Sequence, residues 1–98
     1  MKLEEHRIIL GFDGVPHRPL PAGAVLDVLQ EQAPAFGPVV GWWADRGHLD
    51  VVLALEALDP HAAVAAIVPV ARAALRGAGV AARLVRVEAE LVDDVELR

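Results

Sequence analysis

The stretch from Gly37 to Leu58 constrains the fold more than any other part of the chain. Two apolar arms, Val39 to Ala44 and His48 to Ala57, are separated by Asp45-Arg46-Gly47. A short polar connection that ends in Gly between two such arms is typical of an antiparallel β-hairpin. We therefore expect two adjacent antiparallel strands in the middle of the sequence.

The segments on either side of the hairpin predict two more strands and a helix. Leu3 to Gly11 has an apolar centre and ends at Gly, which indicates a first strand. Ala22 to Ala33 carries apolar residues at helical spacing and stops before Pro34, which predicts a first helix. Val80 to Val92 alternates apolar and charged residues, which predicts the last strand.

A second helix follows the hairpin and has the clearest end signals. Asp59 is a favoured N-cap residue, and Pro60 suits the first helical position. We expect this helix to run to about Arg76, to end at Gly77 and to bend at Pro69. Helical spacing continues across the proline, and the residues expected to face the core are Val64, Ile67, Val68, Ala71 and Leu75.

The order strand, helix, strand, strand, helix, strand predicts an α+β fold of the ferredoxin-like βαββαβ type. In that arrangement a four-stranded antiparallel sheet carries both helices on one face, and the first and third strands are central. A chain of 98 residues is long enough for one domain only. We place this domain at residues 1–92 and expect 93–98 to be an acidic C-terminal tail.

Missing residue types exclude several classes of function. The chain has no Cys, Ser, Thr, Tyr or Asn, which excludes disulfides, Cys-ligated metals and Ser, Thr or Cys nucleophiles. The net charge is −5 without a basic stripe, so nucleic-acid binding is not expected. No apolar run reaches about 18 residues and no signal peptide is evident, so we expect a cytoplasmic protein without membrane contact. The histidines lack metal-ligand spacing, and we expect no metal and no cofactor.

One face of the predicted sheet is left open by the helices. Alternation along the third strand turns Leu49, Val51, Leu53 and Leu55 toward the core. The open face then carries one of Trp42 and Trp43 together with His48, Asp50, Val52, Ala54, Glu56, Glu5, Arg7, Ile9, Leu84, Arg86, Glu88 and Glu90. We interpret this face as a solvated surface with cross-strand ion pairs, or as a dimer face or shallow ligand surface.

Two places on the predicted fold carry candidate ligand-binding side chains. His48 and Asp50 share a strand face, as an acid–base pair or two metal ligands would; the alternative is an exposed His beside an Asp. His17 and Arg18 lie in a loop before the first helix, where free backbone N–H groups attract anions. The alternative for that loop is a proline-stiffened connection with solvated side chains.

Short motifs resemble the acylphosphatase family over about a quarter of the chain. Gly14-Val15-Pro16-His17-Arg18 is similar to the Gly-Val-x-x-Arg phosphate cradle that follows the first strand in that family. Gly41-Trp42, followed by Asp45-Arg46-Gly47 and Leu49-Asp50-Val51, resembles its Gly-Trp hairpin. The resemblance implies an anion-binding role for Arg18. The catalytic Asn of the family has no counterpart, because this chain contains no Asn.

The outer side of the second helix is weakly polar. The residues opposite its expected core stripe are Ala62, Ala66, Pro69, Val70 and Ala73. A helix that is apolar on nearly all sides is usually buried, so this surface is a candidate contact with another subunit or protein. The alternative is that alanine is simply a strong helix former on an exposed surface.

These observations support three functional hypotheses. The first is a non-catalytic module that forms a homodimer or binds another protein, because 55% of the residues are hydrophobic and nucleophiles are missing. The second is a dimeric small-molecule binder or cofactor-free enzyme, with His48 or His17 as acid–base and a pocket lined by Trp42, Trp43, Phe12 and Phe36. The third is an acylphosphatase-like domain that binds or hydrolyses phosphate compounds through Arg18.

Overall fold

The computed structural model describes residues 2–16 and 21–92. Within these ranges the chain forms four strands, two α-helices and two short 3₁₀ turns. Their order and bounds are β1 (Glu4–Asp13), α1 (Pro21–Gln32), η1 (Pro34–Phe36), β2 (Val39–Trp43), η2 (Ala44–Arg46), β3 (His48–Ala57), α2 (Pro60–Gly77) and β4 (Arg83–Leu91).

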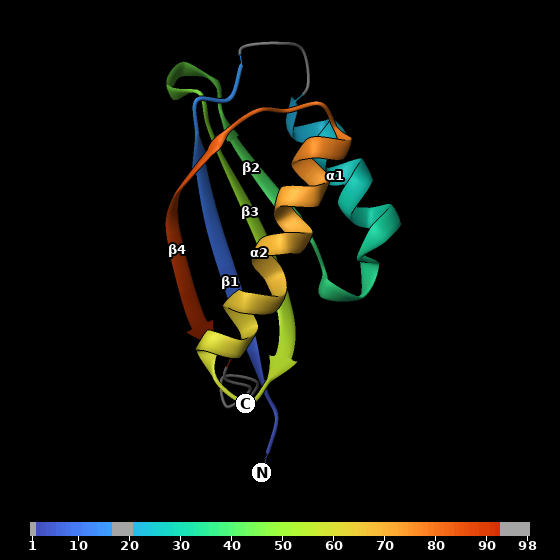
Figure 1. Cartoon of the computed structure of the whole chain (residues 1–98), viewed down its shortest axis with the longest axis vertical. Helices are drawn as coiled ribbons and strands as arrows, with labels where there is room; N and C mark the ends of the chain where they lie inside the picture. Colours follow the sequence, from blue (N-terminus) through green and yellow to red (C-terminus); the bar gives the residue numbers. More distant parts are fainter. Residues whose placement is uncertain (1, 17–20, 93–98) are drawn as a thin grey trace, which may run out of the picture.

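The four strands form one antiparallel sheet in the order β2-β3-β1-β4. Both helices lie on the same side of this sheet, as Figure 1 shows. The predicted α+β class is therefore confirmed, with β1 and β3 in the centre. The strand order is also consistent with the predicted ferredoxin-like arrangement.

The predicted hairpin is present, with its turn folded into η2. Gly47 follows η2 with φ of 59°, a left-handed conformation that glycine adopts without steric cost. Its carbonyl accepts a hydrogen bond of 3.0 Å from the backbone N–H of Val15. This bond holds the chain that leaves β1 against the hairpin turn, so the ends of β1 and β2 meet the start of β3.

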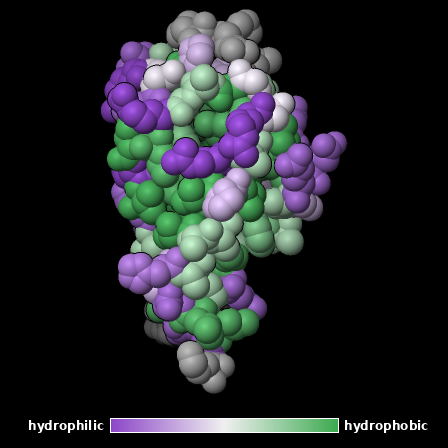
Figure 2. All heavy atoms as spheres, in the orientation of Figure 1, coloured by the Kyte–Doolittle hydropathy of each residue, from purple (hydrophilic) through white to green (hydrophobic). Residues whose placement is uncertain are grey.

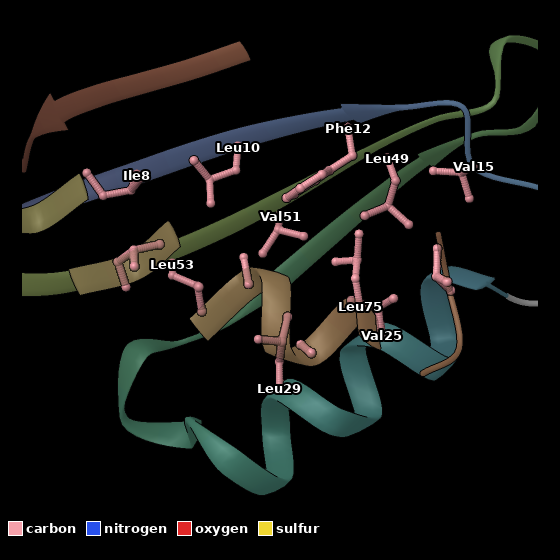
Figure 3. Packing of buried hydrophobic residues seen from close by; sticks show 14 of the residues in the cluster. Ile8, Leu10, Phe12, Val15, Val25, Leu29, Leu49, Val51, Leu53 and Leu75 are labelled. Atoms are coloured by element: carbon pink, nitrogen blue, oxygen red, sulfur yellow. The ribbon is translucent and has the colours of Figure 1, made fainter. Parts of the chain in front are cut away.

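The core lies between the sheet and the helices (Figure 3). Alternate residues of β3 point into it, as the sequence predicts. The largest fully buried side chains from the two central strands are Ile8, Leu10, Phe12, Leu49, Val51 and Leu53. The helices cover them with Val25, Leu29, Ile67, Ala71 and Leu75.

Helix α2 begins as the sequence predicts, and its buried face includes two alanines beyond the predicted core stripe. The carboxylate of Asp59 accepts a hydrogen bond of 2.8 Å from the backbone N–H of Ala62, which satisfies one free donor of the first turn. The helix continues through Pro69 without a break. Val64 and Val68 pack against the core and are partly buried, as expected, and Ala63 and Ala74, which were not expected there, are fully buried.

On strand β4, the prediction that Leu84 lies on the open face is wrong. A bulge in its pairing with β1 places Arg86 opposite Gly11 but Leu84 opposite Phe12. Val85 is the extra residue, and it shifts the alternation by one position. Leu84 therefore packs against the core instead of lying on the open face.

The helices bear on the prediction that the protein makes no membrane contact. In the part of the chain that the structure describes, no helix combines the length and apolar character needed to cross a bilayer. The predictions for residues 17–20 and for the C-terminal tail 93–98 lie outside the described residues.

Candidate functional site

A cavity of about 330 Å³ lies on the open side of the sheet, beside the hairpin turn. It is built from the end of β1, the β2–β3 hairpin and β4. We call it the His48 pocket, and its lining residues are Asp13, Trp43, Arg46, His48, Asp50 and Arg86.

The imidazole of His48 is held between two carboxylates. Its Nδ1 lies 2.6 Å from Oδ1 of Asp13, and its Nε2 lies 2.7 Å from Oδ1 of Asp50. Asp50 shares the strand face of His48, as predicted from their spacing. Asp13 reaches His48 from β1: Phe12 pairs with Leu49, and because the two strands are antiparallel, Asp13 follows Phe12 on the side where His48 precedes Leu49.

The two carboxylates change the protonation of His48. The hydrogen bond that His48 donates to Asp13 is the largest influence and raises the pKa of His48 above its ordinary value of 6.5. Burial acts against this rise, and the bond to Asp50 together with the charges of both carboxylates adds to it. The protonated imidazole can donate from both ring nitrogens, which matches its two acceptors.

Two glycines make the floor of the pocket. Asp50 on β3 pairs with Gly41 of β2 on one side and with Gly11 of β1 on the other. Gly11 in turn pairs with Arg86 of β4. A Cβ atom added to Gly11 would lie 3.0 Å from Cε1 of His48 and 3.2 Å from Oδ1 of Asp50. A Cβ atom on Gly41 would lie 2.9 Å from the six-membered ring of Trp43. A larger residue at Gly11 would therefore crowd His48, Arg86 and Asp50, and one at Gly41 would displace the Trp43 ring.

Aromatic and cationic groups form the walls. The Trp43 ring is tilted by 59° against His48 at a centroid distance of 5.7 Å, and the Arg46 guanidinium lies 5.9 Å from the Trp43 ring. Arg86 donates to Glu88 at 2.7 Å and lies 3.9 Å from the carboxylate of Asp50. With His48 protonated, the lining carries three cationic groups and two carboxylates, and Glu88 adds a third carboxylate beside Arg86.

The sheet register separates the two tryptophans. Trp43 is opposite His48 and lies on the open side, whereas Trp42 is opposite Leu49 and packs against the core. Phe12 is buried in that core, and Phe36 lines a different groove. The four aromatic side chains that were expected to line one pocket therefore lie in different places.

The predicted contact surface on α2 contains an apolar groove of about 450 Å³. Pro69, Val70 and Ala73 form one wall, and Phe36 with its η1 neighbours forms the other. Ala62 and Ala66 are exposed nearer the start of the helix and do not line this groove. Figure 2 looks onto this side of the molecule and shows green and pale-green surface over α2, crossed by purple side chains.

The predicted binding residues and the lining of the His48 pocket overlap only in part. His17 and Arg18 lie outside the described residues, so the structure does not place the anion-binding loop. Asp13 and Arg46 had not been expected at the site. Extending the first strand by two residues would have found Asp13, because that residue continues the pairing with the hairpin.

A metal is not indicated by the geometry of this cluster. Asp13 and Asp50 occupy opposite ring nitrogens of His48, so the three side chains do not converge on one point. Over residues 2–16 and 21–92, no group of three or more His, Cys, Asp or Glu side chains is arranged to hold a metal ion.

Comparison with known proteins gives no match by which to name the site. No protein-family model, no curated protein and no solved structure matches the chain significantly. We therefore infer the function from the chemistry of the residues themselves.

Proposed function

We propose that this is a ferredoxin-like domain that binds a small organic anion in the His48 pocket. The observation that carries the proposal is the set of basic groups around Trp43: Arg46, Arg86 and His48, whose pKa is raised by its carboxylate partners, line one cavity of about 330 Å³. That volume lies at the small end of the usual range for ligand pockets. A flat molecule with one carboxylate or phosphate group fits this combination of charge and aromatic surface.

The unequal exposure of the two carboxylates indicates how an anion enters. Asp13 is 42% exposed, whereas Asp50 is 14% exposed. The ligand therefore displaces Asp13 from Nδ1 of His48, and Asp50 keeps the imidazole oriented through Nε2. Nδ1–H then donates to the anion, and Arg46 and Arg86 line the same pocket as further positive charges.

Tryptophan fluorescence tests this proposal directly. We would titrate the protein with small aromatic and aliphatic carboxylates and with phosphate monoesters, and follow quenching. Trp42→Phe leaves the open-side ring in place and should keep the response. Trp43→Phe removes that ring and should abolish it. A response that persists in Trp43→Phe would place the ligand elsewhere, and no response across the panel would contradict the proposal.

Calorimetry with a responding anion tests the role of the imidazole. His48→Gln keeps hydrogen-bonding capacity but loses the positive charge, so we expect binding to weaken about tenfold or more. His61→Gln is the matched control, because His61 is exposed on α2 and does not line the pocket. Equal affinities in both variants would remove His48 from the binding site.

A second candidate function is protein binding through α2. It is favoured by the apolar groove, in which Pro69, Val70 and Ala73 face Phe36. Ala73→Glu places a charge in the groove, and Ala66→Glu places one on the exposed helix surface beside it. Each variant should disrupt association without unfolding the domain. If both keep the wild-type mass and fold, this surface is not the contact.

The acylphosphatase-like hypothesis is kept as a third candidate, because it rests only on Arg18 and the short motifs around it. Hydrolysis of a generic acyl phosphate tests it. Activity that is lost in Arg18→Ala would support the assignment, whereas activity that survives the substitution would remove it.

A further inference from the structure

Strand β4 presents a long edge of the sheet. It is nine residues long and contains no Pro or Lys, and its edge protection is limited to the bulge at Val85 and four charged side chains. On its other side it pairs with β1, so within the described residues its outer N–H and C=O groups have no strand to pair with. The opposite edge, β2, has only five residues and is interrupted by Gly41. Figure 1 shows β4 alone along one flank of the molecule.

Apolar side chains accompany this open edge. Val85, Val87 and Leu91 are 46%, 45% and 54% exposed. Val87 and Leu91 lie on the helix side of the sheet, because they pair with Leu10 and His6. The helices leave them half uncovered, and a second strand beside β4 would cover them.

We propose that β4 pairs antiparallel with β4 of a second copy of this chain, about a two-fold axis at Val87. The result is a continuous eight-stranded sheet with all four helices on one face. The proposal stands independently of anion binding in the His48 pocket.

Charge complementarity selects this register. With Val87 opposite its own copy, Arg86 of each chain lies opposite Glu88 of the other, and Val85 lies opposite Ala89. Opposite charges across a strand pair are favourable, and like charges are unfavourable. The midpoint of Arg83–Leu91 is also Val87, so the axis lies at the centre of the strand. The bulge at Val85 limits the regular pairing to the residues around that centre.

Neighbouring registers lack this complementarity. An axis at Arg86 places two guanidiniums opposite each other, and an axis at Glu88 places two carboxylates opposite each other. An axis at Ala89 sets Glu88 against Glu90. An axis at Val85 sets Arg86 against Leu84 and forms no ion pair. A two-fold pair must centre on a residue, because directly opposed side chains share a face of the sheet.

Complementary charge reversal tests both the surface and the register. Arg86→Glu gives each copy two acidic positions, and Glu88→Arg gives each copy two basic positions, so each variant alone should dimerise about ten- to a hundredfold more weakly. An equimolar mixture of the two variants should form a heterodimer, because opposite charges then meet at both positions. The double variant, Arg86→Glu with Glu88→Arg, should dimerise as the wild type does.

Native mass over a range of concentrations is the readout, with 10.4 kDa expected for the monomer. Val87→Lys should also give a monomer, and Val39→Lys on the other edge strand should not; circular dichroism checks that each variant is folded. A wild type that stays monomeric at its highest soluble concentration would overturn the proposal. So would a dimer that the single charge reversals leave intact, or variants that do not associate when mixed.

Discussion

Gly11 lies directly beneath the imidazole of His48, and a Cβ atom added to it would be 3.0 Å from Cε1. The same atom would be 3.1 Å from Cβ of Arg86, which cannot move without shifting β4. Gly11→Ala should therefore push the imidazole away from Asp13. We expect anion binding to weaken about tenfold and the free energy of unfolding to fall by about 1–3 kcal/mol, measured by calorimetry and urea denaturation.

Gly77→Ala is the matched control for this substitution. Its Cβ atom would lie 3.5 Å from the nearest side-chain atom, on Val28, which is an ordinary contact. Because Gly77 is helical, alanine should stabilise the protein by about 0.5–1 kcal/mol. If Gly11→Ala binds and unfolds like the wild type, the glycine floor is not required.

The raised pKa of His48 links stability to pH. The folded protein holds the imidazole proton more tightly than the unfolded chain, whose His has the ordinary pKa of 6.5. The resulting stabilisation is fully present below pH 6.5 and is lost as the pH rises through the raised pKa of the folded state. Denaturation midpoints from pH 5 upward, about one unit apart, should show this decline in the wild type.

The contribution of His48 can be isolated with two variants. His48→Gln should lose this part of the pH dependence, whereas His61→Gln, on the exposed start of α2, should keep it. NMR titration of the imidazole resonances should show a lower pKa of His48 in Asp13→Asn, since the bond to Asp13 is the largest cause of the rise. An unchanged pKa in that variant would contradict the assignment.

The N-cap of α2 gives a prediction about stability alone. Asp59→Ala removes the acceptor of the Ala62 N–H, and we expect the free energy of unfolding to fall by about 1 kcal/mol. Asp27→Ala, at an exposed position inside α1, should be neutral or slightly stabilising because alanine is the better helix former. Equal effects in urea denaturation would show that the cap contributes nothing.

His6 is the buried polar residue of the core. It is 3% exposed, and its Nε2 finds no hydrogen-bond partner among the described residues. His6→Leu replaces it with an apolar side chain of similar size, so we expect the protein to gain about 1–3 kcal/mol of stability. His61→Leu, on the surface, should change little. A loss of stability in His6→Leu would mean that the imidazole has a favourable partner.

Local sequence signals were sufficient where neighbouring residues decide the outcome. The hairpin, the alternation of Leu49, Val51 and Leu53, and the cap at Asp59 all depend on spacing within one element. The pairing of His48 with Asp50 was predictable for the same reason, since residues two apart on a strand share a face. Trp43 was predicted as one of two alternatives, because alternation alone did not show which tryptophan faces the core.

Local patterns were thus enough to predict the order and kind of the elements and most of the side chains that share a face. Three features follow from long-range contacts instead: Asp13 reaches His48, Leu84 turns inward at the bulge, and Trp43 lies over Gly41. These depend on where β1 ends and on its register with two neighbouring strands. That register is set by contacts between segments distant in the sequence, and no local periodicity contains this information.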